Sequence, residues 1–242
     1  MLVGFWNTRS QASLSALKAL FYNRIGDVGI LIGMALIFHY VRSLDFSIIM
    51  LLTPYLVGLK VTFLGYDIAI LSIISILFLI GLVGKSAQLG LHALLPDAME
   101  GPTPVSALIH AATIVTAGIF LVLKMSFFFE FIPLALCIMV FIGCFTAFTA
   151  GLMALLQYDI KKIIALSTCS QLCYMVLMCW LSQYESAFYH LINHAFFKAL
   201  LFLSSGIVIH LYSNGQDVRK IAGLKSISRI FIFVFLLGVY SL

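Results

Sequence analysis

The sequence predicts an all-α membrane protein, a polytopic transmembrane helical bundle. Apolar residues make up 63% of the chain and charged residues only 10%, with a mean hydropathy of +1.14. This composition leaves too little polar surface for a water-soluble domain of 242 residues. The apolar residues also lie in continuous runs rather than in the alternating pattern of barrel strands. We therefore expect helices that cross a bilayer.

Six segments supply the mostly apolar runs of about 20 residues that spanning helices need. In chain order they are 19–41, 68–83, 104–123, 131–156, 163–182 and 187–209. The apolar ends of the chain, 1–6 and 227–242, are shorter, and we expect them to be partial helices of a fold that is incomplete at both ends. We predict a single membrane domain over residues 1–242, with no secretory signal.

The cysteines and the net charge exclude several function classes. All five cysteines lie within apolar segments without a CxxC pair, which argues against a disulfide framework or a zinc site. Buried thiols of this kind usually only pack. The net charge of +5 does not indicate nucleic-acid binding, because the basic residues lie between apolar segments without clustering. We expect membrane lipids as surroundings and no nucleic-acid partner.

The basic residues divide unequally between the two sides of the membrane if the spans alternate in direction. One side receives nine of them, namely Arg9, Lys18, Arg24, Lys161, Lys162, Arg219, Lys220, Lys225 and Arg229. The other side receives three, namely Arg42, Lys60 and Lys124. By the positive-inside rule the first side faces the cytoplasm or, in an organelle, the matrix. Lys85 and Lys198 belong to neither side, because each lies within an apolar segment.

Lys85 lies where a helix is expected to break. Gly81 and Gly84 precede it closely, and prolines at 96, 102 and 104 follow. A lysine at the centre of a spanning helix costs about 2.5–3.5 kcal/mol, and a helix broken at membrane depth is tolerated only against protein or a water-filled cavity. We predict that Lys85 lies on an ion pathway; the alternative is an interfacial anchor whose ammonium reaches the headgroups.

The run HLINHAFFK places His190, His194 and Lys198 four residues apart, within about 80° of one helix face. We call these three residues the His-Lys stripe. Histidine exchanges protons near neutral pH, and a lysine removed from water also becomes able to do so. We predict a proton relay, with structural hydrogen bonding as the alternative. We expect no metal, since Leu191 stands where a zinc protease motif carries glutamate.

Three weaker signals accompany these residues. His110 lies on a segment rich in small residues that allow close helix packing, and it is either a relay residue or a core histidine. Asp27 lies three residues after Arg24, near the inner end of the first span, so it either pairs with Arg24 or sets the potential at Lys85. Polar residues within 167–171 (Ser167, Thr168, Ser170 and Gln171) either line a wet channel or bond to a neighbouring helix.

Several segments of the chain resemble those of a known protein family. The run from Gly84 to Gly118 is GKSAQLGLHALLPDAMEGPTPVSALIHAATIVTAG, which resembles the signature of the antiporter-like chain 5 subunits of NADH:quinone oxidoreductase. The resemblance continues through NRIGDVG, DIKKIIALSTCSQLCYM and HLINHAFFKALLFLSSG, so it covers nearly the whole chain. The sister subunits 4 and 2 lack DAMEGPTPVSALIHAAT, whereas multi-subunit sodium/proton antiporters come closer.

The resemblance implies a fold of two inverted repeats of five helices with a discontinuous helix. It also implies a role for each position. Lys85 is similar to the central lysine of the first half-channel, at the helix break, and Asp27 matches an acidic position on the helix before it. His110 matches a relay residue beside this lysine, and the His-Lys stripe matches the connection toward the second half-channel.

The sequence also departs from the family pattern. Leu94 stands where members usually have tryptophan, and Gly90 and Leu91 stand where they have proline and phenylalanine, so the loop after Lys85 is expected to pack differently. The family's partner glutamate, before the GFW run, and its second lysine, after residue 227, fall outside these 242 residues. We expect a split gene whose other products supply these helices, and the alternative is a truncation.

The resemblance implies proton translocation by a pumping subunit of NADH:ubiquinone oxidoreductase, coupled to electron transfer elsewhere. The chain has no dinucleotide loop, iron–sulfur cysteine set or haem ligand pair, so NADH, FMN, iron–sulfur clusters and quinone are expected in partner subunits. The rival functions are a subunit of a multi-subunit Na⁺/H⁺ antiporter and a non-pumping structural fragment. The 21 phenylalanines and low charge favour the mitochondrial inner membrane over the alternative, a bacterial plasma membrane.

Overall fold

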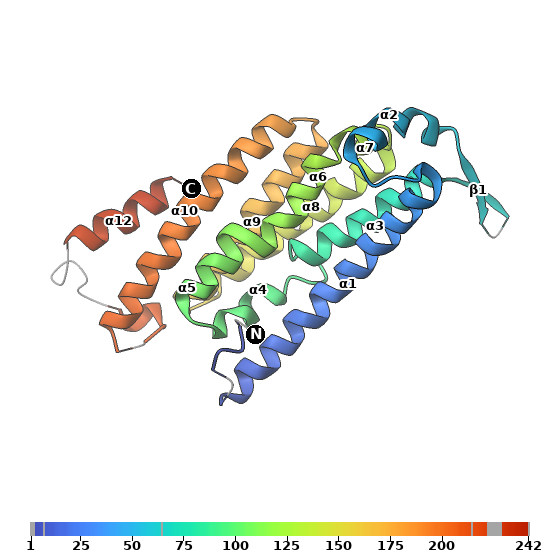
Figure 1. Ribbon diagram of the computed structural model, residues 1–242. Coiled ribbons are helices and arrows are strands. Elements are labelled where there is room, and N and C mark those ends of the chain that lie inside the picture. Colours follow the sequence, from blue (N-terminus) through green and yellow to red (C-terminus); the bar gives the residue numbers. More distant parts are fainter. Residues whose placement is uncertain (1–2, 7, 64, 214, 222–228, 242) are drawn as a thin grey trace.

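The computed structural model (Figure 1) describes residues 3–6, 8–63, 65–213, 215–221 and 229–241, with the side chains of 63, 66, 110–112 and 229–232 left out. The described chain is mostly helical, with one small hairpin. Its elements are α1 (Ser10–Val41), α2 (Phe46–Val57), β1 (Lys60–Phe63), β2 (Tyr66–Ala69), α3 (Ile70–Lys85), α4 (Leu94–Asp97), η1 (Ala98–Glu100), α5 (Thr103–Ser106), the π-helix η2 (Ala107–Thr113), α6 (Ile114–Lys124), α7 (Ser126–Phe129), α8 (Pro133–Leu155), α9 (Ile160–Trp180), α10 (Tyr184–Leu211), η3 (Val218–Lys220) and α12 (Arg229–Tyr240).

The expected membrane helical bundle is confirmed. Within the described residues, five helical segments are long and apolar enough to cross a membrane: Ser10–Val41, Thr103–Lys124, Pro133–Leu155, Ile160–Trp180 and Tyr184–Leu211. The sixth expected span corresponds to α3, which has only 16 residues and ends at Lys85. Large apolar side chains face outward, as on α8, where Phe141 is 67% exposed. Such a surface suits lipid or neighbouring membrane helices.

The structure corrects the expected boundaries near the N-terminus. Residues 3–6 form turns rather than the expected partial helix, and α1 begins at Ser10, nine residues before the apolar run at 19. No proline or glycine interrupts residues 10–18, so the helix extends beyond its apolar part. The apolar run alone was therefore a poor guide to where this helix starts.

Two elements between α1 and α3 were not expected. The helix α2 begins at Phe46, after the N-cap residue Asp45, whose side chain accepts a hydrogen bond from the Ser47 amide, and its 12 residues are too few to cross a membrane. The strands β1 and β2 then pair antiparallel, with Lys60 opposite Ala69. Gly65, with φ +84°, lies in the turn between them, a conformation that glycine adopts readily.

The helices α1 and α3 pack with their backbones in contact. A Cβ atom on Gly84 would lie 2.6 Å from the Cα atom of Gly26, and one on Gly29 would lie 2.7 Å from the Leu77 carbonyl oxygen. Small residues at a crossing let two membrane helices approach closely. Because Gly26 and Gly84 directly precede Asp27 and Lys85, this contact brings those two residues together.

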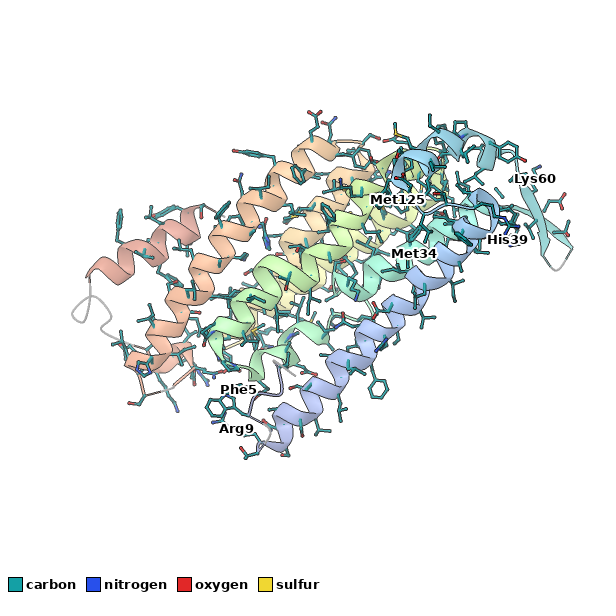
Figure 2. All side chains as sticks on the ribbon, viewed as in Figure 1. Phe5, Arg9, Met34, His39, Lys60 and Met125 are labelled. Atoms are coloured by element: carbon teal, nitrogen blue, oxygen red, sulfur yellow. The ribbon has the colours of Figure 1, made fainter. Side chains whose placement is uncertain are left out.

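The two ends of the bundle differ in charge. The start of α1 and the end of α10 lie at one end in Figure 1, and α2, α7 and the hairpin lie at the other. Figure 2 labels Arg9 at the first end and Lys60 at the second. At the first end Lys18 forms an ion pair with Asp97, with 2.9 Å between Nζ and Oδ2. The places of Arg9, Lys18 and Lys60 agree with the expected division of basic residues; Lys225 lies outside the described residues, as does the side chain of Arg229.

Candidate functional site

Lys85 is the last residue of α3 and forms an ion pair with α1. Its Nζ atom lies 2.6 Å from Oδ1 of Asp27, and the two side chains are 24% and 32% exposed. At 1.5 Å per residue, Asp27 lies about 25 Å from the first residue of α1 and about 21 Å from its last. Both lengths exceed half the thickness of a hydrocarbon core, about 15 Å. The ion pair therefore lies well inside the length of this helix.

The structure shows which cation the Asp27 carboxylate meets. Its carboxylate pairs with Lys85 and not with Arg24, which forms no ion pair with any residue that the structure describes. Asp27 also lies near the middle of α1 rather than near its inner end as expected, because the helix begins earlier than the apolar run. Asp27 is therefore placed to set the potential at the Lys85 ammonium.

The chain turns sharply after Lys85. Ala87 and Gly90 have positive φ angles of 50° and 98°, and the segment continues into the short helix α4. Proline fixes φ near −65°, so the backbone found at Gly90 is closed to the proline usual in the resembling family. The expected difference in this loop thus has a physical basis, since the turn at Gly90 requires a residue without a Cβ atom.

A buried polar cluster that the sequence analysis missed holds this turn. Oε1 of Gln88 lies 2.7 Å from the Thr146 hydroxyl of α8 and 3.2 Å from the Cys173 thiol of α9, and both groups can donate to it. All three residues are almost completely buried. We call Gln88, Thr146 and Cys173 the Gln88 cluster. No pattern in the sequence predicts this cluster, because its three residues lie on segments that are far apart along the chain.

The His-Lys stripe faces the polar residues of α9. The Lys198 ammonium donates to the Ser167 hydroxyl at 2.9 Å, and Nε2 of His190 lies 2.9 Å from Oε1 of Gln171. The hydroxyls of Thr168 and Ser170 donate instead to carbonyls of their own helix. Half of the polar patch within 167–171 therefore bonds to the neighbouring helix.

His194 and Lys198 are both 0% exposed. Neither ring nitrogen of His194 has a hydrogen-bond partner among the described residues, and the ring meets Phe197 edge-on, with 5.4 Å between centroids. The described part of the chain also offers Lys198 no carboxylate within 4 Å. Buried polar groups without partners are costly. The packing of the helices does not need these two polar side chains, so His194 and Lys198 remain candidate functional residues.

The cluster and the stripe contact opposite faces of α9. Cys173 lies two residues after Gln171, which is a rotation of about 200° around the helix, so the thiol points to the helix break and the amide to α10. The segment 103–124 also connects the two regions, because η2 packs against α10 while α6 packs against α3. His110 lies on η2, but its side chain falls outside the described residues.

The comparisons with known proteins place the chain in a family. The family described as "NADH:quinone oxidoreductase/Mrp antiporter, TM" matches residues 1–242. The chain belongs to this family. Among relatives within the NADH:quinone oxidoreductase/Mrp antiporter family, NADH-ubiquinone oxidoreductase chain 5 of Chondrus crispus is 51% identical, and NADH-quinone oxidoreductase subunit L of Rickettsia bellii is 49% identical, each over all of this chain. The resemblance to chain 5 is thereby confirmed.

The chain spans 36% of the Chondrus crispus relative and 38% of the Rickettsia bellii relative. Two solved structures are similar to this chain in three dimensions. A chain of the Mrp complex from Dietzia sp. DQ12-45-1b has a TM-score of 0.78 and 30% identity, covering 86% of this chain and 22% of that one. A chain of the archaeal membrane-bound sulfane sulfur reductase has a TM-score of 0.81 at 20% identity, covering 98% and 47%, and shows the fold alone.

Proposed function

We propose that this chain translocates protons across an energy-conserving membrane, as part of the chain 5 subunit of an NADH:ubiquinone oxidoreductase. The observation that carries the proposal is the ion pair of Lys85 and Asp27 at the end of a broken helix, 2.6 Å apart and inside the length of α1. A charged lysine at such a depth is costly unless it is paired or hydrated, and charged residues there mark ion pathways in membrane proteins.

In the proposed mechanism the Lys85 ammonium holds a proton while the Asp27 carboxylate faces it. The approach of another positive charge, or the withdrawal of the carboxylate, releases that proton. Moving one charge across the membrane works against about 2.3 kcal/mol per 100 mV. Attraction between unit charges a few ångströms apart is of comparable size or larger at an effective dielectric constant of about 20. A change in one pair of charges is therefore sufficient to drive the step.

The proposed route continues from Lys85 along the segment 103–124, which carries His110, to the His-Lys stripe. The ring nitrogens of His194 support this route, because they have no hydrogen-bond partner among the described residues and can exchange hydrogen bonds with water. The Ser167 and Gln171 side chains hold the two ends of the stripe. The stripe would then pass the proton toward the second half-channel of the subunit.

Electron transfer belongs to other subunits in this proposal. NADH, FMN, the iron–sulfur clusters and the quinone would bind there, and the chain itself would carry no cofactor and perform no redox chemistry. Its partners would be the other membrane subunits of the complex, including whichever chains carry the family's glutamate and second lysine. The chain 5 relatives favour the mitochondrial inner membrane, and the Rickettsia bellii relative keeps a bacterial plasma membrane as the alternative.

Replacing Lys85 with methionine tests the proposal, because it removes the ammonium and keeps much of the side-chain length. In the assembled complex, reconstituted into vesicles, NADH oxidation should continue while proton uptake or release coupled to it is lost. Lys60→Met is the matched control, since Lys60 lies on the hairpin outside the helices, and it should pump normally. Normal pumping by Lys85→Met would overturn the proposal and favour a structural fragment.

The similarity to the Mrp complex keeps a second function under test. A subunit of a multi-subunit Na⁺/H⁺ antiporter would use the same lysines and histidines. Its activity would need Na⁺ and would persist without NADH. Proton movement that depends on NADH and is unchanged when Na⁺ is replaced by choline supports the oxidoreductase; the reverse result supports the antiporter.

A further inference from the structure

A cavity of about 810 Å³ lies at the basic end of the bundle, outside the proposed proton route. It is formed by the turns before α1, the segment before α5, the start of α9 and the end of α10. Its size lies within the range of small-molecule sites, about 300–1,000 Å³. Three basic side chains line it, namely Arg9, Lys161 and His210, and among its described lining residues Glu100 is the one acid.

Lys161 is the unusual residue of this cavity. It is only 5% exposed, and its Nζ atom donates to the Gly101 carbonyl oxygen at 3.3 Å. No carboxylate of the described chain lies within 4 Å of it. An ammonium has three protons to donate, and among the described residues the Gly101 carbonyl is the one acceptor that Lys161 is given. Glu100, which also lines the cavity, attracts this charge without forming an ion pair with it. A buried charge that is only partly compensated is costly, and an anion in the cavity would lower that cost.

The neighbouring lysine, Lys162, differs from Lys161 in that it forms an ion pair. Lys162 forms an ion pair with Asp159, with 3.1 Å between Nζ and Oδ2, and its side chain is 35% exposed. It does not line the cavity. The two lysines are adjacent on α9 and carry the same charge, yet only Lys161 is buried against the cavity. The burial of a lysine against the cavity is therefore specific to position 161 and is not shared by the adjacent lysine.

The rest of the lining indicates the kind of anion. Leu203 and Ile207 of α10 give the cavity an apolar wall, and Trp6 lies at its rim with the Arg9 guanidinium 5.8 Å from the ring centroid. Tryptophan and basic side chains beside an apolar surface are typical of the headgroup layer. Basic pockets between membrane helices on the positive side bind phosphate-bearing headgroups, and arginine and lysine suit phosphate oxygens.

We propose that this cavity is a phosphate site, in which Lys161 and Arg9 bind the phosphate of a membrane phospholipid or a free phosphate. The bound phosphate would neutralise Lys161 and tie the turns before α1 to α9 and α10. The site does not depend on proton translocation.

The test uses the assembled complex, purified in detergent and washed to remove loosely held lipid. Native mass spectrometry counts the phospholipids that remain on Lys161→Met, with Lys162→Met as the matched control. We expect Lys161→Met to lose one phospholipid that the wild type and Lys162→Met keep. Arg9→Met, at the cavity rim, should show the same loss and serves if Lys161→Met does not assemble.

A second measurement distinguishes the source of the phosphate. Radiolabelled inorganic phosphate is added to delipidated complex, and binding is compared between the wild type and the same variants. Unchanged lipid counts with phosphate binding lost in Lys161→Met or Arg9→Met would support a site for free phosphate. If neither variant changes the lipid count or phosphate binding relative to Lys162→Met, the proposal is overturned.

Discussion

Replacing Gly84 with alanine should separate α1 from α3 and weaken the ion pair of Lys85 and Asp27. The added Cβ atom would lie 2.6 Å from the Gly26 Cα atom, whereas ordinary contacts begin near 3.4 Å. The helices must therefore move apart by about 0.8 Å or more. If the ion pair opens from 2.6 Å to between 3.4 and 4 Å, the attraction weakens by about 1.5–2 kcal/mol at an effective dielectric constant of about 20. Overpacking adds a cost of about 1–3 kcal/mol.

The assay is the thermal stability of the assembled complex together with the number of protons pumped per NADH oxidised. Both should fall in Gly84→Ala. Gly151→Ala is the matched control, because Gly151 lies on α8 with no atom within 4 Å of an added Cβ, and it should behave as wild type. Wild-type stability and pumping in Gly84→Ala would refute the argument that backbone contact between α1 and α3 holds the two charges together.

Three further predictions concern other parts of the structure. Gln88→Leu removes the acceptor that the Thr146 hydroxyl and the Cys173 thiol share, while each keeps another acceptor nearby, so the complex should lose about 0.5–1.5 kcal/mol of stability, measured by thermal unfolding, and an unchanged melting temperature would count against the cluster. His194→Leu removes two buried ring nitrogens that have no partner in the described part of the chain, so stability should hold or rise while pumping is lost; retained pumping would exclude His194 from the route. The Arg219 guanidinium holds the pKa of Asp217 below its ordinary value of 3.8, so this contact stabilises the segment above pH 3.8 and the stabilisation is lost as pH falls through the lowered pKa. Hydrogen-exchange protection of the Arg219 amide should fall over that range in the wild type and not in Asp217→Asn.

Much of the bundle could be predicted because the bilayer imposes simple requirements on sequence. Continuous apolar runs located the long helices, since each must satisfy its own backbone groups in lipid. The glycines before Lys85 and the prolines after it located the helix break. The four-residue spacing of the His-Lys stripe placed its members on one face, because that spacing depends only on helix geometry. These features are local in sequence.

The features that could not be predicted depend on contacts between distant segments. Arg24 is closer to Asp27 in sequence than Lys85 is, and only the packing of α1 against α3 shows which cation the carboxylate meets. The Gln88 side chain has its hydrogen-bond partners on α8 and α9, whose residues lie far from it in sequence. The hairpin at 60–69 contains β-branched residues, which favour strands. An apolar membrane helix would also contain such residues, so they did not predict the hairpin. The spacing of residues in the sequence does not show which distant residues will be in contact.

The central claim is that titratable side chains inside the bundle lie on a hydrated path. The most direct measurement is a cryo-EM map of the assembled complex in lipid nanodiscs, at a resolution that shows ordered water. We predict water oxygens about 2.7–3.2 Å from the ring nitrogens of His194 and from Nζ of Lys85. A map in which the Lys85 ammonium lies among lipid headgroups, and His194 is enclosed by apolar side chains without water, would contradict the account.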